Sequence, residues 1–226
     1  MRNNARLFVA EFIGTFFLVF AGVGAIVANA YRDGSVGLVG IAAAHGLALA
    51  IGVSATMGIS GGHLNPAVTL GLWSVGRIDM KKAGLYLLAQ LLAATVAALA
   101  VKSLYPEMAA AATRVGTPSL APDVSMAQGI IVEAILTFML VFAVMGTVVD
   151  PVAPRIGGFG VGLTVFFGVL AGGNITGAAM NTARAFGPAL VSGSWTGQAV
   201  YWIGPILGGI LACQVYERLL MKKATD

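Results

Sequence analysis

The sequence predicts an all-α membrane protein with six transmembrane helices and two re-entrant half-helices in an inverted repeat. Three observations predict this class. Only 10% of the 226 residues are charged and the mean hydropathy is +0.90, whereas soluble domains carry about 25% charged residues. Apolar runs long enough to cross a bilayer recur along the chain, and its two halves repeat one another. So few charges exclude soluble, disordered and coiled-coil proteins.

The net charge and the cysteine content limit the kinds of partner and cofactor that we expect the protein to bind. A net charge of +4 and a pI of about 9.5 could indicate nucleic-acid binding. At this low charge density, cationic loops that face the cytoplasm explain it better. The single Cys213 cannot form an internal disulfide and has no companions for a metal site. We therefore predict no nucleic-acid partner, no metal and no cofactor.

Six apolar runs each have about the 20 residues needed to cross a bilayer core. The first is too long for the apolar part of a signal peptide and lacks a clear cleavage site, so we interpret it as a retained span. The six runs are Leu7–Asn29, Val36–Ile59, Ala83–Leu104, Ala127–Val149, Ile156–Ala171 and Gln198–Leu220.

Two further stretches, Asn65–Val75 and Asn181–Val191, are too short to cross and each follows Gly-rich sequence. They predict half-helices that enter the membrane from opposite sides. The distribution of cations fixes the orientation, because cytoplasmic loops are enriched in Lys and Arg. With both termini in the cytoplasm, the cytoplasmic segments hold Arg2, Arg6, Arg77, Lys81, Lys82, Arg155, Arg218, Lys222 and Lys223, and the outer segments hold Arg32, Lys102 and Arg114.

An internal repeat relates the two halves of the chain. At an offset of 116 residues, positions 45–67 align with 161–183 without a gap, and nine of the 23 pairs are identical. Glu11-Phe-Ile-Gly-Thr15 likewise corresponds to Glu133-Ala-Ile-Leu-Thr137. Each half has three spans, so the second must lie upside down relative to the first. Inverted repeats with interrupted helices place a site near the bilayer midplane; we expect the repeats over about 5–105 and 125–220.

Asn65 and Asn181 each begin a half-helix, where Asn is a strong N-cap and Pro66 at the next position loses no hydrogen bond. The two N-termini are expected to meet near mid-membrane, each with roughly half a positive charge from its dipole. This arrangement repels cations, while the Asn amides donate to a passing oxygen; simple capping is the alternative. Arg184, on the first turn of the second half-helix, is expected to face the pore rather than to snorkel, because buried Arg is costly.

Glu11 and Glu133 are acids that lie within the expected spans at matching positions near the start of the two halves. They could form a proton or ion relay, but their matching repeat positions favour a structural role as acceptors for backbone N–H groups of the re-entrant loops. His45 lies in mid-span without an evident sequence partner, and a buried core histidine is the alternative to a pore role. His63 precedes Asn65 in the loop, where it could simply bond to the backbone.

These residues closely resemble the aquaporin family, the major intrinsic proteins. The resemblance covers essentially the whole chain, so we expect one aquaporin-like channel domain over residues 1–226. It implies a right-handed bundle of six helices and two half-helices, a homotetramer with one pore per subunit, and passive conduction that excludes protons. The matching segments are Ala10-Glu-Phe-Ile-Gly-Thr15, Ser60-Gly-Gly-His-Leu-Asn-Pro-Ala-Val-Thr69, Met180-Asn-Thr-Ala-Arg-Ala-Phe-Gly-Pro-Ala189 and Tyr201-Trp-Ile-Gly-Pro205.

One position departs from the family pattern. The second Asn-Pro-Ala of the family reads Asn181-Thr182-Ala183 here. Thr182 keeps Asn181 in register but lacks the fixed φ of proline, and it adds a hydroxyl and an N–H. We expect a modest local change at the pore midplane, because proline at the first helical position is favourable rather than required.

The resemblance assigns the family's aromatic/arginine constriction to His45, Val169, Ala178 and Arg184. Strict water channels usually have Phe, His, a small residue or Cys, and Arg at these places; glycerol channels have Trp, Gly, Phe and Arg. The present set is most similar to plant vacuolar-membrane aquaporins, with His first and an aliphatic residue second. Members of that group pass water, and several pass ammonia, urea or peroxide.

The leading hypothesis is a passive water channel that also passes small uncharged solutes and excludes protons and ions. Two features support this hypothesis. Glycerol channels have other residues at the positions of Ala185 and Ala189, and water channels have a pair similar to Tyr201-Trp202. The alternative is a channel whose physiological solute is ammonia, glycerol, urea, peroxide or an uncharged metalloid such as arsenite.

Two other classes fit less well. An ion-coupled transporter would need titratable groups at the central site, and only Glu11 and Glu133 qualify. An enzyme is not expected, since no paired acids, activated nucleophile or metal cluster occur at suitable spacing. We predict a multi-pass protein of the plasma (inner) membrane with both termini cytoplasmic. Its partners would be the lipid bilayer, water and small neutral solutes.

Overall fold

The computed structural model describes residues 2–152, 154 and 156–221, and the regular structure within them is helical. Six segments are long and apolar enough to cross a membrane. In two of them an α-helix continues into a π-helical turn, η2 (Met145–Val149) or η3 (Tyr216–Leu220). The α-helices of the six spans are α1 (Arg2–Tyr31), α2 (Gly37–Ser60), α4 (Met80–Leu104), α6 (Met126–Val144), α7 (Gly158–Thr176) and α9 (Val200–Val215).

The two half-helices are α3 (Pro66–Ser74) and α8 (Thr182–Ser192), and the long connection from α4 to α6 holds α5 (Glu107–Ala112) and the short η1 (Arg114–Gly116). The six spans and both half-helices are thus confirmed, most within a few residues of the predicted bounds. The largest differences are at the start of the first span, which begins at Arg2 and not at Leu7, and at the end of the fifth, which ends at Thr176 and not at Ala171. The Gly-rich stretch at its end stays helical because it is packed: the Leu136 side chain occupies the space that a Cβ at Gly172 would need.

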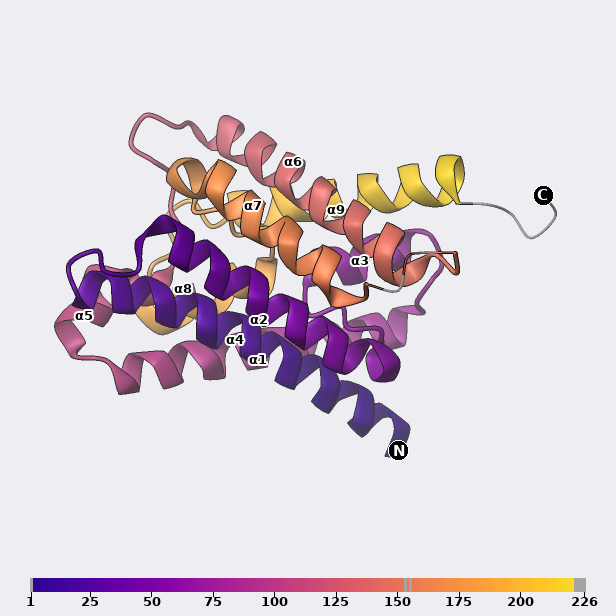
Figure 1. Ribbon diagram of the computed structural model, residues 1–226, viewed down its shortest axis with the longest axis horizontal. Helices are drawn as coiled ribbons and strands as arrows, with labels where there is room; N and C mark the ends of the chain where they lie inside the picture. The colour runs from indigo at the N-terminus through magenta and orange to yellow at the C-terminus, as the bar shows by residue number, and fades with distance from the viewer. Residues whose placement is uncertain (1, 153, 155, 222–226) are drawn as a thin grey trace.

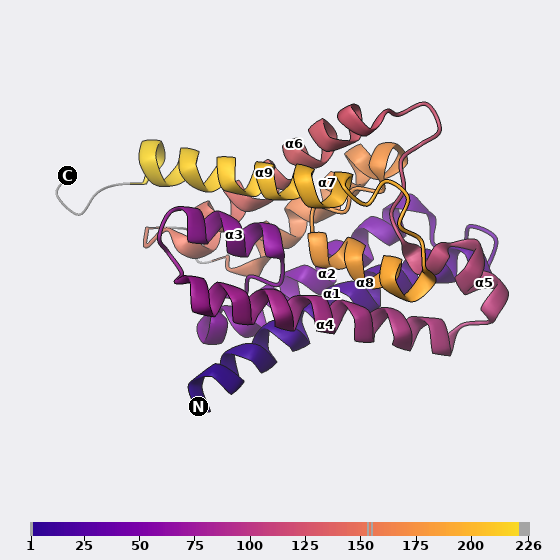
Figure 2. The same ribbon diagram turned by 180° about the vertical axis from the view of Figure 1, so that it is seen from behind.

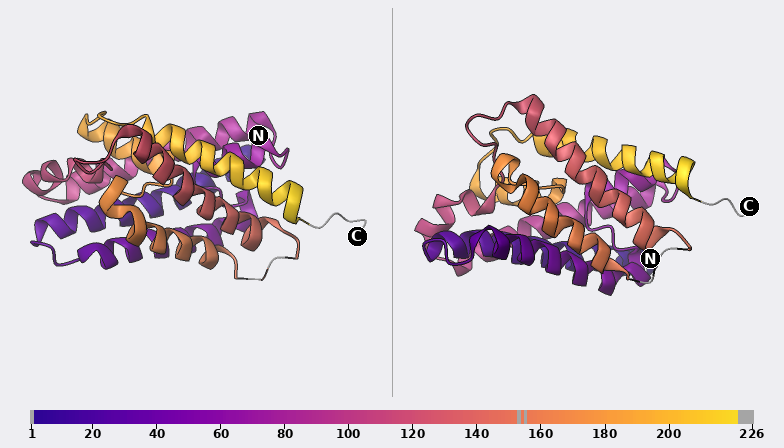
Figure 3. Two further views of the ribbon diagram at one scale, coloured as in Figure 1. Left: turned by 90° about the horizontal axis from the view of Figure 1, so that it is seen from above. Right: turned by 45° about the horizontal axis from the view of Figure 1, so that its top comes forward.

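The long helices lie side by side along the longest axis of the molecule (Figure 1). The start of α1, the end of η3 and the α6–α7 connection lie at one end of the bundle, and α5 lies at the other (Figures 1 and 3). Seen from behind, α3 and α8 lie roughly in line, one toward each end (Figure 2). Six spans, an even number, bring the start and the end of the helical bundle to the same side.

The half-helices close the bundle by packing on the opposite half of the chain. The contacts run from α4 through α1, α2, α7 and α6 to α9, and the half-helices fill the remaining side. There α3 packs chiefly on α9, and α8 packs chiefly on α4. Each half-helix is therefore held by the last span of the other half, and their N-termini are brought together inside the bundle.

Glycines allow the two halves to approach closely. A Cβ at Gly46 on α2 would lie 2.7 Å from the carbonyl oxygen of Gly162 on α7, and a Cβ at Gly162 would clash with the carbonyl oxygen of Gly46. The two glycines occupy equivalent repeat positions. Of the cations that set the predicted orientation, Arg155, Lys222 and Lys223 lie outside the described residues.

Candidate pore and constriction

Asn65 and Asn181 cap the two half-helices, as predicted. Both have extended backbone angles, with φ of −159° and −150°. The Asn65 Oδ1 accepts from the N–H of Ala67 at 2.9 Å, and the Asn181 Oδ1 accepts from the N–H groups of Ala183 at 3.0 Å and Arg184 at 3.2 Å. Both side chains are buried. The side-chain oxygen of each Asn is thereby committed to its own helix.

The amide nitrogens of the same two residues bind across to the other half. The Asn65 Nδ2 donates to the carbonyl oxygen of Met180 at 2.8 Å, and the Asn181 Nδ2 donates to that of Leu64, also at 2.8 Å. Each acceptor directly precedes the other Asn in the chain. An amide NH₂ has two protons, so one N–H on each Asn stays free for another acceptor. The sequence repeat was the only signal that could have indicated this exchange.

The two loops that precede the half-helices share an unusual backbone. Leu64 has φ of +51° and Met180, its repeat equivalent, has φ of +49°. Gly61 and Gly177 are also left-handed, with φ of +92° and +83°. A positive φ is strained for a residue with a side chain. Its recurrence at equivalent positions shows that both loops are shaped to direct the same carbonyl groups toward the junction.

Glu11 accepts hydrogen bonds from the first loop. Its carboxylate accepts from the Ser60 hydroxyl at 2.6 Å, from the backbone N–H of His63 at 3.0 Å and from that of Leu64 at 2.7 Å. The Gln90 side chain donates a fourth hydrogen bond at 2.8 Å. Glu11 is fully buried. These contacts satisfy loop N–H groups that have no water within reach at membrane depth.

Glu133 makes the equivalent contacts in the second half. It accepts from the Thr176 hydroxyl at 2.7 Å and from the backbone N–H groups of Ala179 at 2.9 Å and Met180 at 2.8 Å. Tyr201 ties down the same loop, because its hydroxyl donates to the Thr176 carbonyl at 2.7 Å. All available oxygens of both acids thus face donors of the protein. This geometry agrees with a structural role of the two acids as hydrogen-bond acceptors. In a relay, the two acids would instead have to take up and release protons.

The first loop carries an additional polar cluster that the second lacks. The His63 Nδ1 lies 3.1 Å from the Thr69 hydroxyl, to which the Gln90 side chain also donates at 3.1 Å. At the repeat positions of His63 and Thr69 the second half has Ala179 and Ala185. The ring of His63 therefore contacts the Thr69 side chain, while its backbone N–H donates to Glu11. His63 is part of the support for the first half-helix.

Arg184 and His45 are in direct contact. The Arg184 Nε lies 3.3 Å from the His45 Nε2, and the His45 Nδ1 lies 2.9 Å from the Ile41 carbonyl oxygen. A neutral imidazole with its proton on Nδ1 satisfies both contacts, since Arg can only donate. His45 packs on Gly22, where a Cβ would overlap its ring. The two residues that the resemblance pairs from α2 and α8 are thus brought together.

Gly116 supplies the second acceptor for Arg184. Its carbonyl oxygen accepts from the Arg184 Nη1 at 3.0 Å. Gly116 is the last residue of η1, whose first two residues also have positive φ, Arg114 at +49° and Val115 at +53°. The loop between α4 and α6 therefore folds back to the predicted constriction. Nothing in its sequence predicts this contact, because a backbone carbonyl has no residue-type signature.

Val169 and Ala178 lie on the apolar side of the predicted constriction. Both are buried and belong to one hydrophobic cluster, against which Leu38 and Ile41 pack. Ala178 begins the strained part of the second loop and has φ of +44°. Of the four residues, His45 and Arg184 have the polar side chains, so Val169 and Ala178 contribute shape and an apolar surface.

Thr182 occupies the first position of α8 and is fully buried. Its hydroxyl has no hydrogen-bond partner within the described residues. Asn181 nevertheless caps α8 with two N–H bonds, where Asn65 makes one before Pro66. The loss of proline at this place therefore leaves the cap intact, and it leaves one buried hydroxyl unsatisfied.

Comparison with known proteins identifies the family. The family model described as "Major intrinsic protein" matches residues 1–216. The chain belongs to the major intrinsic protein family. Its similarity to individual members extends over nearly the full length of both chains. Aquaporin TIP4-4 of Zea mays is 49% identical over 96% of this chain and 87% of its own length. Aquaporin TIP4-1 of Arabidopsis thaliana is 48% identical over 96% of this chain and 87% of its own length.

A solved structure of another aquaporin-family protein has the same fold. The X-ray structure of the aquaglyceroporin from Plasmodium falciparum superimposes with a TM-score of 0.84 at 30% sequence identity, covering 96% of this chain and 97% of that chain. Membership of the family and six apolar helices establish an integral multi-pass membrane protein. This aquaporin is a passive channel for water and small solutes, and its predicted likeness to vacuolar-type plant aquaporins is confirmed by the TIP-type relatives.

Proposed function

We propose that this aquaporin conducts chiefly water, through the junction of its two half-helices, and excludes protons and ions. The observation that carries the proposal is the reciprocal bonding of Asn65 and Asn181. Each amide is held by its own helix and by the opposite loop, which leaves one N–H of each amide free for a passing oxygen. Donors fixed on one side orient a water molecule without being able to accept a proton from it.

Positive charge at two levels supports exclusion of cations. The N-termini of α3 and α8 each present roughly half a positive charge at the junction. Arg184 adds a full charge, and within the described residues no carboxylate lies within 4.0 Å of its guanidinium. Its neutral partners, His45 and the Gly116 carbonyl, position the charge without cancelling it. We propose His45, Val169, Ala178 and Arg184 as the selectivity constriction.

Stopped-flow light scattering on proteoliposomes tests the water channel. The purified protein should raise the osmotic permeability well above that of empty liposomes, with no proton conductance detectable by an enclosed pH-sensitive dye. A permeability no higher than that of empty liposomes would contradict the proposal.

A second candidate is a channel whose physiological solute is ammonia, glycerol, urea, peroxide or arsenite. The apolar Val169 and Ala178 at the predicted constriction favour it, since they leave one wall without polar contacts. Uptake of each solute, measured beside water in the same proteoliposomes, separates the two candidates. For each solute and for water, the uptake is divided by the leak through protein-free liposomes. A larger ratio for one of these solutes than for water would favour the second candidate.

We further propose that Glu11 and Glu133 hold the re-entrant loops and do not carry protons, and that the chain catalyses no reaction. Their hydrogen bonds to loop N–H groups support this role. We propose one channel domain over residues 1–226 with repeats of about 5–105 and 125–220. Each repeat would then contribute one glutamate that holds a loop and one half-helix.

The assembly and the membrane are also proposals. A homotetramer with one pore per subunit is expected for this family, and native mass spectrometry of the detergent-solubilised protein tests it. The sequence predicts the plasma membrane with both termini cytoplasmic. The similarity to TIP-type plant aquaporins favours a vacuolar membrane instead. Fractionation of membranes from the source cells, with an antibody to the channel, decides between these two membranes.

A further inference from the structure

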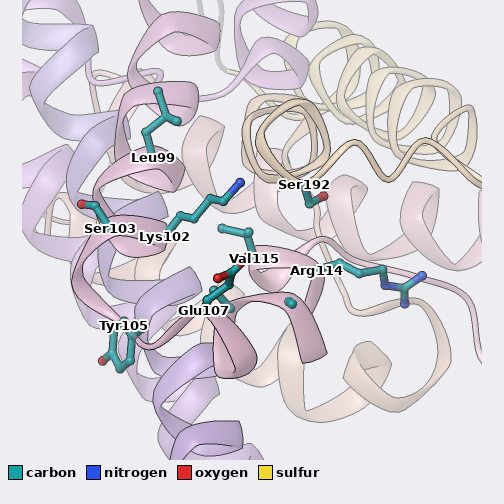
Figure 4. Close-up of a pocket in the computed structure, with 10 residues that line it drawn as sticks. Leu99, Lys102, Ser103, Tyr105, Glu107, Arg114, Val115 and Ser192 are labelled. Carbon is teal, nitrogen blue, oxygen red and sulfur yellow. The ribbon is translucent and has the colours of Figure 1, made fainter.

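A cavity of about 640 Å³ lies at the end of the bundle away from the chain termini. The last turns of α4, together with α5, η1 and the end of α8, form its wall. Its size falls in the usual range for sites that bind small molecules, about 300–1,000 Å³. Figure 4 shows that Lys102 reaches into it while the Arg114 guanidinium points away. None of the residues that line the cavity belongs to the junction of the half-helices or to the proposed constriction.

Two opposite charges face this cavity. Lys102 comes from the last turn of α4, and Glu107 from the first turn of α5. Within the described residues they form no ion pair with each other. The Lys102 ammonium has one long contact, at 3.5 Å to the Val191 carbonyl oxygen, and it can donate three hydrogen bonds. An anionic group and a cationic group at a short distance within one ligand would match this pair.

An apolar stripe on α4 leads to the cavity from the membrane side. Leu88, Leu92, Val96 and Leu99 are 54%, 45%, 44% and 51% exposed. Their spacing of three or four residues places them on one face of the helix. Leu99 lines the cavity itself, and Lys102 continues the same face one turn later. Charged residues just beyond an apolar helix face lie at the level of lipid headgroups.

We propose that this cavity binds the headgroup of an amine-bearing zwitterionic phospholipid, whose acyl chain lies along the α4 stripe. Lys102 pairs with the phosphate, and Glu107 pairs with the protonated amine. The hydroxyls of Ser103 and Ser192, which also line the cavity, provide further donors to the phosphate oxygens. The stripe distinguishes a lipid from a soluble zwitterion, because only a lipid would cover both the charged cavity and the exposed leucines.

Native mass spectrometry of the delipidated full-length protein, given equal amounts of phosphatidylethanolamine and phosphatidylglycerol, tests this site. The unmodified channel should retain phosphatidylethanolamine in preference. Lys102→Gln should lower retention of both lipids about fivefold, the upper value for a partly exposed charge pair. Glu107→Gln should abolish only the preference for phosphatidylethanolamine. Arg218→Gln and Asp123→Asn, exposed charges elsewhere on the chain, should retain lipid like the unmodified protein.

Three results would overturn the proposal. These are equal retention of the two lipids by the unmodified channel, equal losses in Arg218→Gln and Lys102→Gln, or displacement of the lipid by water-soluble glycerophosphoethanolamine. The osmotic permeability of Lys102→Gln should match that of the unmodified protein, which shows that the variant is folded. The test thereby separates failure of this lipid site from failure of the channel.

Discussion

Arg184 is a buried cation whose partners are neutral. Burial of an isolated charge is costly unless hydrogen bonds compensate for the lost water. His45 and the Gly116 carbonyl provide two such bonds, and they come from α2 and from the loop before α6. The guanidinium is thus fixed by contacts with two other parts of the chain, and within the described residues no ion pair neutralises its charge.

Replacement of Arg184 by Val should widen and neutralise the proposed constriction. We expect higher uptake of urea and glycerol and a measurable proton leak in proteoliposomes, because the fixed charge and its donors are lost. The control is Arg114→Gln, which removes an exposed cation at the same end of the bundle. Unchanged selectivity of Arg184→Val would remove this residue from the filter.

Glu133 illustrates how a buried acid can be structural. Glu133→Gln replaces one acceptor oxygen by an NH₂ group that would face the backbone donors of Ala179 or Met180. An unsatisfied buried donor costs about 1–3 kcal/mol. The melting temperature of the purified protein should fall, whereas Asp123→Asn at an exposed site should leave it unchanged. A normal melting temperature with a lost proton-coupled flux would instead support a relay.

The half-helices show that a short helix can be stabilised by contacts beyond the helix propensity of its own residues. At nine and 11 residues, neither α3 nor α8 would be stable by itself in water, where isolated helices need about 12–15 residues. Caps at their N-termini and packing on α9 and α4 stabilise them. Proline at the first position is therefore a small contribution, which agrees with the intact cap behind Thr182.

Thr182→Pro tests this view of the second half-helix. The substitution removes a buried unpaired hydroxyl and fixes φ where the helix begins, so it should stabilise the protein by about 0.4–1 kcal/mol. Water permeability should be unchanged. Ala183→Pro is the matched control, since it deletes an N–H that Asn181 caps and should destabilise. A large change in permeability of Thr182→Pro would show that the threonine is functional.

The close approach of α2 and α7 depends on glycine. A Cβ at Gly162 would overlap the Gly46 carbonyl oxygen, whereas a Cβ at Gly84 on α4 meets nothing within 4 Å. Gly162→Ala should therefore destabilise by about 1–3 kcal/mol through overpacking, and Gly84→Ala should stabilise by up to about 1 kcal/mol. Thermal unfolding in one detergent measures both. Equal effects of the two substitutions would contradict this account of the helix contact.

At the scale of the whole molecule, the two halves complete one another. The last span of each half packs on the half-helix of the other, and each Asn amide bonds to the loop of the other. Neither half alone holds a half-helix on both sides. The proposed pore midplane therefore depends on the fold of the whole chain.

The orientation in the membrane can be tested with single cysteines. Ser35→Cys, in the exposed α1–α2 loop, and Lys81→Cys, at the start of α4, lie at opposite ends of the bundle. Native Cys213 is buried and should contribute little background. An impermeant thiol reagent applied to intact cells should label Ser35→Cys only if the channel lies in the plasma membrane with the predicted orientation. Labelling of Lys81→Cys alone would reverse it.

The sequence by itself determined the spans, the two half-helices, their Asn caps and the family. These features depend on local composition, on spacing within a few residues and on a repeat that can be aligned. It also indicated that Glu11 and Glu133 would serve the loops, because at membrane depth backbone donors need internal acceptors.

Only the tertiary structure decided what meets at the centre. The exchanged bonds of Asn65 and Asn181 join residues 115 and 117 apart, and Arg184 meets a backbone carbonyl 68 residues away. A cap is predictable because its donor and acceptor are neighbours in the chain. A bond to a distant carbonyl depends on how the helices pack and how the loops turn, and every residue type presents that same carbonyl.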